Sequence, residues 1–250
     1  MLSPIRTLEI PLDSIESARI AAPLATRLEL CDDLSSEGWT PTMELIRGCR
    51  ELVEGTQTTL VSMIRPRLAG ASRALDVAAF ATTPRSLDAS LREIEASALA
   101  GAHSVAIGML TPDGFVDMDA CARLGQLARD HGLVVAFLRT FDLLADRDRG
   151  VRDIVALGFT RFISAGVLGW DAAVAPLSVR IDVLRRDQEV AQREATRLGR
   201  ACIEVVPAGG VRASNAREWL AITPHLHASC RRDGAFNVDE LNALREEMKA

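Results

Sequence analysis

The sequence predicts a (β/α)8 barrel, the TIM barrel, as a single domain over residues 1–250. Short apolar runs alternate with longer amphipathic ones along the chain, which is the pattern of repeated strand and helix units. Eight such pairs can be counted, and eight units in about 250 residues match this barrel in number and size. Glycines end several helical stretches and the next strand soon begins, so little room remains for a domain linker.

The predicted strands are rich in Val, Ile, Leu and Phe, as buried parallel strands should be. They begin near Thr7 (TLEIP), Arg27 (RLELC), Thr59 (TLVSMI), Ser104 (SVAIGML), Leu133 (LVVAFLR), Arg161 (RFISAG), Ala201 (ACIEVVPAG) and His225 (HLHASC). A last helix from Val238 (VDELNALREEM) would close the barrel. An open doubly wound sheet is the alternative, but the first strand-to-helix turn has no G-x-G-x-x-G.

Two segments interrupt this rhythm. The loop from Pro66 to Thr83 is long enough to be a lid, although surface filler fits its composition equally well. The charged stretch that begins at Arg185 is typical of a solvated helix face.

The residue inventory excludes several kinds of chemistry. The single lysine is Lys249, next to the last residue, so a Schiff-base lysine, pyridoxal phosphate and a Walker phosphate loop are not expected. The missing glycine fingerprint argues against NAD. Proton transfer must therefore fall to carboxylates, cysteines or the four histidines.

Charge and cysteine content predict the setting of the protein. The net charge is −5 and no basic block occurs, so no nucleic-acid partner is expected. The five cysteines form no C-x-x-C pair, which fits a reducing compartment. No apolar run approaches a membrane span, and the N-terminus does not resemble a signal peptide. The predicted location is the cytoplasm.

Two carboxylates fall where the interior of the barrel is expected. Side chains alternate along a strand, and the leucines of RLELC should face the outer helices, which turns Glu29 and Cys31 inward. The same alternation turns Glu9 inward on the neighbouring strand, roughly 5 Å away. Interior carboxylates must pair with arginine, bind a metal or share a proton.

Partners for these carboxylates follow the strands, on the face where barrel enzymes assemble their sites. Arg65 and Arg67 follow the third strand, and Arg139 ends the fifth, with Asp142 just beyond. Guanidinium groups there suit a carboxylate or phosphate ligand. The alternative is a structural network of arginines and carboxylates that fills the barrel mouth.

The last two strands contribute further candidates. Gly209 and Gly210 would let backbone amides approach an anion, although tight turns also need glycine. His227 shares a strand face with Ser229 and is either an acid, base or ligand, or a packed core histidine. Cys31 is either a soft-metal ligand or a small buried hydrophobe.

Several stretches together resemble the CutC family, named for copper homeostasis. They lie in order over most of the chain: LEIPLDSIESA from Leu8, RLELCDDLSSEGWTPT from Arg27, MIRPR from Met63, GMLTPDGFVDMD from Gly108, FLRTFD from Phe137, LGFTRFISAG from Leu157, PAGGVRASN from Pro207 and HLHASCR from His225. The resemblance implies a (β/α)8 barrel, commonly a homodimer, that is linked to copper handling.

The sequence departs from the family pattern at four places. Pro11 replaces a cysteine, so only Cys31 remains of a proposed copper-binding pair, and one thiolate is a poor site for monovalent copper. Leu138 replaces the histidine of F-H-R, and Trp39 replaces a glycine. The expected Gly-Gly-Asp-Phe is absent from LAGASRALDVAAF.

Three functions follow from these observations. The first, which the family resemblance implies, is a cytoplasmic copper homeostasis protein that acts through copper binding, with Cys31 as a ligand, or through an indirect role. The second is an enzyme acting on a small anionic metabolite, with catalytic residues Glu9, Glu29, Asp142 and His227 and substrate-binding residues Arg65, Arg67, Arg139, Gly209, Gly210 and Ser229. The third is a barrel that has lost catalysis, which should show a mouth filled by salt bridges and no free cavity.

Overall fold

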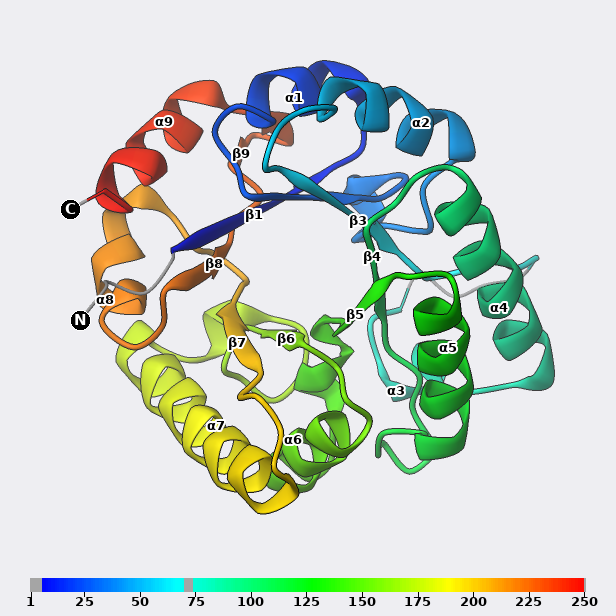
Figure 1. Ribbon diagram of the computed structural model, residues 1–250. Coiled ribbons are helices and arrows are strands. Elements are labelled where there is room, and N and C mark those ends of the chain that lie inside the picture. Colours follow the sequence, from blue (N-terminus) through cyan, green and yellow to red (C-terminus); the bar gives the residue numbers. More distant parts are fainter. Residues whose placement is uncertain (1–5, 70–73, 250) are drawn as a thin grey trace.

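The computed structural model describes residues 6–69 and 74–249 and confirms the predicted (β/α)8 barrel (Figure 1). Each predicted strand segment contains a strand: β1 Thr7–Leu12, β2 Arg27–Leu30, β3 Thr59–Met63, β4 Ser104–Ile107, β5 Val134–Phe137, β6 Arg161–Ser164, β7 Glu204–Pro207 and β8 His225–His227. Neighbouring strands are parallel, in the order β7-β6-β5-β4-β3-β2-β1-β8. At the seam, the Thr223 hydroxyl donates to the carbonyl oxygen of Val205 at 3.1 Å, which joins the entry of β8 to β7.

Helices surround the strands as the outer layer (Figure 1). Their bounds are α1 Ile15–Ala21, α2 Met43–Leu52, α3 Val77–Phe80, α4 Pro84–Leu99, α5 Met118–Asp130, α6 Arg147–Ala156, α7 Leu177–Leu198, α8 Ala216–Leu220 and α9 Val238–Glu247. Side-chain caps fix several helix starts. Thr83, for example, accepts from the Ser86 amide at 3.0 Å, and the Ser86 hydroxyl accepts from the Thr83 amide at 2.9 Å. The predicted closing helix is α9.

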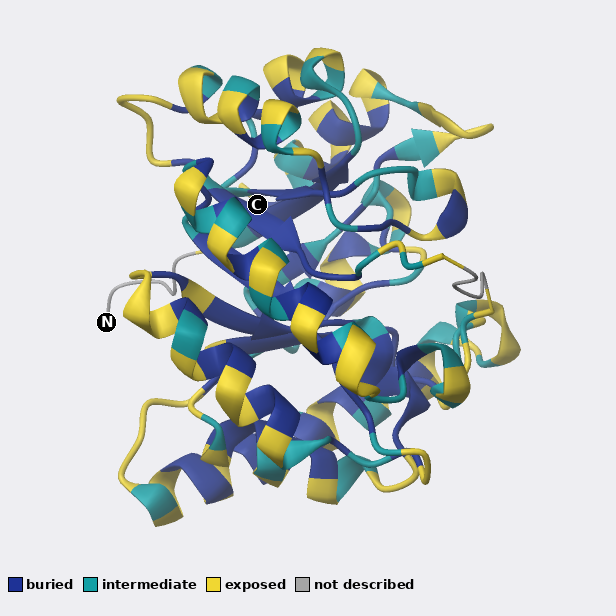
Figure 2. Ribbon diagram, turned by 90° about the vertical axis from the view of Figure 1, so that its right-hand side faces the viewer, coloured by how far each residue is buried: buried dark blue, intermediate teal, exposed yellow. Residues whose placement is uncertain are grey.

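The core lies mainly between the strands and the helices, whose buried stripes face inward in Figure 2. Leu28 and Leu30 belong to this layer, as the alternation along β2 predicts. A separate small cluster contains Cys31, Val61, Met63, Ala106, Ala136 and Leu138. Because Val61 and Met63 alternate with outward-facing Leu60 on β3, this second cluster lies on the interior face of the barrel.

The structure differs from the sequence predictions in three segments. The loop from Pro66 to Thr83, interpreted as a lid or as surface filler, contains α3, and its residues 70–73 lie outside the described residues. A short hairpin, β9 Arg231–Arg232 and β10 Ala235–Phe236, follows β8 and was not predicted. The charged stretch from Arg185 lies on α7, but one of its faces is not solvated, because Asp187 is buried against Arg147 with an Nη2–Oδ2 distance of 2.6 Å.

Candidate functional site

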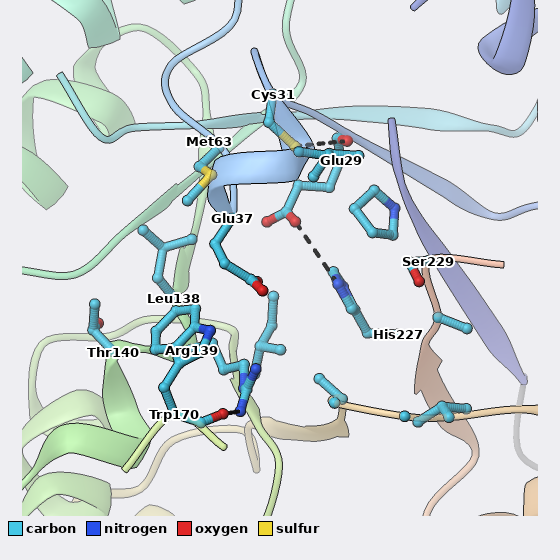
Figure 3. A pocket seen from close by; sticks show the side chains of 18 of the residues that line it. Glu29, Cys31, Glu37, Met63, Leu138, Arg139, Thr140, Trp170, His227 and Ser229 are labelled. Atoms are coloured by element: carbon cyan, nitrogen blue, oxygen red, sulfur yellow. Dashed lines mark hydrogen bonds and ion pairs between the residues drawn. The ribbon is translucent and has the colours of Figure 1, made fainter. Parts of the chain in front are cut away.

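A cavity of about 280 Å³ lies at the C-terminal end of the barrel strands, where barrel enzymes hold their substrates. Figure 3 shows side chains from both halves of the chain pointing into it. Seven of the predicted site residues line this cavity: Glu29, Cys31, Arg139, Gly209, Gly210, His227 and Ser229.

Glu9 lies beneath the cavity as a fully buried, ionised carboxylate. Its Oε2 lies 3.0 Å from Arg161 Nη2 and 3.4 Å from Arg27 Nε, and its Oε1 lies 3.0 Å from His227 Nδ1. Burial alone would raise the pKa of Glu9, but the Arg161 charge, the hydrogen bond to His227 and the Arg27 charge outweigh it and hold this pKa far below its usual range. Glu9 is thus a fixed negative charge at neutral pH.

His227 joins this buried carboxylate to the cavity. Because Glu9 is ionised, His227 Nδ1 is the donor of the bond between them, which leaves Nε2 directed toward Glu29, with a distance of 3.9 Å to Oε2. Burial lowers the pKa of His227, but the hydrogen bond to Glu9 and the charges of Glu29 and Glu9 outweigh it, so this pKa is raised. Both ring nitrogens therefore face a carboxylate.

Glu29 is the carboxylate of this pair that faces the cavity. Only 5% of its surface is exposed, and burial raises its pKa to about 7, with the charge of Glu9 adding to the effect and that of His227 opposing it. Both carboxylates lie inside the ring of strands, as alternation predicts, and they differ in charge because only Glu9 is paired with arginine.

Arg139 reaches the cavity, whereas Asp142 does not. The 3-10 helix Arg139–Leu143 follows β5 and turns the Asp142 carboxylate back into the protein. There Asp142 Oδ1 accepts from the Ser164 hydroxyl at 2.6 Å and from Arg147 Nη1 at 3.1 Å, and Oδ2 accepts from Arg139 Nε at 3.2 Å. Asp142 is thus placed to orient Arg139 rather than to contact a ligand.

Arg65 and Arg67 lie outside the cavity lining. The Arg65 guanidinium stacks on Trp39 at 4.2 Å and donates to the carbonyl oxygens of Ser36 and Gly38 at 3.3 and 3.1 Å. Arg67 is half-exposed and forms ion pairs with Asp32 and Asp33. Arg65 thus holds a loop over the barrel mouth. A sequence motif alone does not distinguish this structural role of the arginine from a role in ligand binding.

The loop held by Arg65 carries a residue that the sequence analysis missed. Glu37 has a left-handed backbone with φ of 61°, a conformation that costs energy for a residue with a side chain. In Figure 3 its carboxylate points into the cavity, on the side facing Arg139. Trp170 was missed as well; its ring lies 4.6 Å from the Arg139 guanidinium. The left-handed backbone has no clear signature in a single sequence.

Two sulfur atoms lie near each other on the cavity wall. A Cβ at Gly38 would lie 2.8 Å from Met63 Sδ and 3.5 Å from Cys31 Sγ. Burial raises the pKa of the Cys31 thiol well above its usual range, and the charges of Glu29 and Asp13 add to this. Within residues 6–69 and 74–249, no group of three or more His, Cys, Asp or Glu side chains is arranged to hold a metal ion.

No helix within residues 6–69 and 74–249 is both long and apolar enough to cross a membrane.

Known proteins resemble this chain over most of its length. The profile of the CutC family matches residues 6–232. A family protein CutC from Vibrio campbellii is 32% identical over 217 residues, which cover 86% of this chain and 77% of the relative. A human protein named copper homeostasis protein cutC homolog is 33% identical over 160 residues, 64% of this chain and 54% of the human protein.

A solved structure of a CutC protein shows a similar fold. The crystal structure of a CutC protein from Streptococcus agalactiae superposes with a TM-score of 0.74 at 23% identity, covering 90% of this chain and 99% of the other. Its similarity supports the barrel, and the matched profile supports the family. The chain belongs to the CutC family.

Proposed function

We propose that this protein is an enzyme that acts on a small anionic metabolite, with Glu29 and His227 as its acid–base pair. The observation that carries the proposal is this pair at the cavity, with 3.9 Å between His227 Nε2 and Glu29 Oε2. Burial raises the pKa of Glu29 to about 7, where a carboxyl group can both give and accept a proton at neutral pH.

The buried carboxylate below the pair supports this role. Glu9 fixes the orientation of the His227 ring and stabilises its cationic form, because the ionised carboxylate accepts from Nδ1 at 3.0 Å. A proton gained or lost by His227 is then exchanged at Nε2, on the cavity side. Glu9 acts as a positioning residue, since it does not line the cavity.

The opposite side of the cavity suits an anion. Arg139 supplies a guanidinium, and Gly209 and Gly210 bring the backbone to the cavity surface. Ser229 lines the same space. A substrate held there by its acid group would present its remaining atoms to Glu29 and His227. One member of the pair would accept a proton from the substrate while the other returns one.

Exchange of substrate hydrogen with solvent tests this proposal. The protein is incubated in deuterated buffer with small hydroxy acids, oxo acids and sugar phosphates, and NMR detects deuterium at carbon. We expect exchange in at least one compound, with a loss of about 100-fold or more in Glu29→Gln. The exposed Glu189→Gln on α7 is the matched control and should exchange like the unmodified protein. Absence of exchange in every compound, or full exchange in Glu29→Gln, would count against the enzyme.

The free cavity also favours an enzyme over a barrel without activity. In that alternative the mouth is filled by salt bridges. Arginine–carboxylate pairs such as Arg139 with Asp142 and Arg231 with Asp13 contribute to the cavity wall and leave about 280 Å³ free.

A second candidate function is the binding of monovalent copper, and the two neighbouring sulfur atoms favour it. Cys31 and Met63 are soft ligands, and their sulfurs lie within 3.5 Å of one point beside Gly38. Met63 would supply the second soft ligand, in place of the cysteine that the family resemblance implies at position 11. The names of the human and mouse relatives refer to copper homeostasis. Copper must displace the thiol proton, so uptake should rise with pH.

Titration of the reduced protein with monovalent copper tests this candidate. We expect one ion per chain, and a loss of at least tenfold in affinity in both Cys31→Ser and Met63→Leu. Cys202→Ser changes an exposed cysteine and is the matched control. Uptake below one ion per chain, or uptake unchanged in Cys31→Ser, refutes ligation by Cys31.

The domain organisation, cellular location and oligomeric state of the protein are part of the same proposal. We infer a single domain over residues 1–250, because β1 and β8, from opposite ends of the chain, pair in one sheet. A cytoplasmic location agrees with the five cysteines, all of which are free. A homodimer is inferred from the family, and light scattering in solution would test it.

A further inference from the structure

The Gly209–Gly210 turn is oriented by a buried arginine on α7. Arg180 is 7% exposed and donates to the carbonyl oxygens of Ala165 at 2.6 Å, Ala208 at 2.8 Å and Gly209 at 2.6 Å. A trans peptide directs its N–H opposite to its C=O. The amides of Gly209 and Gly210 therefore point away from Arg180, which does not line the cavity, while both glycines do.

The same turn lies close to Arg139. A Cβ at Gly209 would lie 3.4 Å from Arg139 Cζ and only 2.9 Å from the Ala165 Cβ, so only glycine fits. Burial lowers the pKa of Arg180, and the Arg139 charge lowers it further. Arg180 is directed to backbone carbonyls behind the turn, so the Arg139 guanidinium, whose Nε pairs with Asp142, and the two glycine amides are the donors at this part of the cavity. Such a set of donors is complementary to an acid group.

Four buried polar side-chain atoms of the cavity-lining residues have no hydrogen-bond partner in the described part of the chain: Glu29 Oε1, Thr140 Oγ1, Trp170 Nε1 and Arg231 Nε. Of these, Glu29 Oε1 is a potential acceptor and Trp170 Nε1 a donor. Figure 3 shows the two side chains facing the same space as Arg139. The Trp170 ring is fixed because it stacks on Phe80 with centroids 6.0 Å apart, and its carbonyl oxygen accepts from Arg139 Nη2. A buried N–H and a buried carboxyl oxygen in one cavity match a ligand oxygen.

We propose that the ligand is a small hydroxy or oxo acid. Its acid group binds Arg139 and the amides of Gly209 and Gly210, and its hydroxyl or carbonyl oxygen binds between Trp170 Nε1 and Glu29 Oε1. This inference rests on the proposed enzyme and names its substrate class. Trp170 becomes a specificity-determining residue, because its N–H distinguishes an oxygenated acid from the same acid without that oxygen. Arg180 becomes a positioning residue for the amides.

Calorimetric titration with matched pairs of acids tests the inference. Lactate is compared with propionate, and 2-hydroxyethyl phosphate with ethyl phosphate, so that the two pairs distinguish a carboxylate from a phosphate ligand. We expect the oxygenated member of at least one pair to bind about tenfold more tightly than its partner. Trp170→Phe retains an aromatic ring for stacking and removes the N–H together with one ring of the indole. It should reduce this ratio to about twofold and leave the affinity for the plain acid unchanged.

Arg180→Met supplies an independent readout, because it should weaken both members of a pair alike and leave their ratio intact. Equal binding within both pairs, absence of binding by all four acids, or an unchanged ratio in Trp170→Phe overturns the inference. The comparison in the unmodified protein decides the matter even where a variant does not fold. Binding of the acids without deuterium exchange would refute the proposed enzyme and leave this binding mode standing.

Discussion

Replacement of Glu29 by glutamine should stabilise the protein in alkaline solution and have little effect in acid. Burial raises the pKa of Glu29 from 4.5 to about 7, so between these values the folded protein holds a proton that the unfolded chain has lost. Stability contributed by this group therefore falls as the pH rises through that range and is lowest above pH 7. At about 1.4 kcal/mol for each pH unit, the full difference is about 3 kcal/mol.

Glutamine resembles the protonated carboxyl group and cannot ionise. The free energy of unfolding of Glu29→Gln, relative to that of the unmodified protein, should thus rise by up to about 3 kcal/mol between pH 5 and pH 8. The rise is an upper value, because at pH 5 most of the unfolded chain has already lost this proton, at its ordinary pKa of 4.5. Urea unfolding at pH 5, 6.5 and 8 measures it, with Glu189→Gln as the exposed control. A difference that stays constant or falls with pH would refute the assignment of Glu29 as a carboxyl group protonated by burial.

Two further predictions concern the Arg161–Glu9 ion pair and the Gly209–Gly210 turn. Arg161→Met leaves the Glu9 carboxylate without its arginine partner at 3.0 Å and should lower the free energy of unfolding by about 3 kcal/mol. Adding Glu9→Gln should restore part of this loss, because no unpaired charge then remains buried. If the losses of the two single variants instead add up in the double variant, the pairing is contradicted. Gly210→Ala should cost about 1 kcal/mol for its φ of 84° alone. Gly209→Ala should cost about 3 kcal/mol, because its Cβ would also meet packed atoms; equal losses in urea unfolding would contradict this packing.

Alternation along the strands predicted the buried half of the site well. Glu9 and Glu29 lie on short parallel strands and Cys31 directly follows β2, so the direction of each side chain follows from its position in the sequence and from the need to bury the leucines. The register then fixes the neighbours, since Glu9 pairs with Arg27 on β2 and with His227 on β8. Such placement requires no knowledge of the loops.

The loop residues could not be placed in the same way. Arg65 and Arg139 both end a strand segment, yet one stacks on Trp39 outside the cavity and the other reaches into it. The choice depends on contacts with segments distant in sequence, because Trp39 and Trp170 each provide an aromatic face for one of the arginines. Spacing along the chain does not encode which arginine meets which ring.

The departures from the family pattern change the cavity in a consistent direction. Leu138 is buried together with Cys31 and Met63, and Pro11 lines the same cavity. These side chains cannot solvate a charge, and burial is the largest cause of the raised pKa of Glu29. The apolar replacements therefore favour the protonated form of Glu29, while the arginines around Glu9 keep that carboxylate ionised. Leu138, where the family resemblance implies a histidine, is thus compatible with acid–base chemistry, because the proposed Glu29–His227 pair supplies a proton donor and an acceptor near neutral pH.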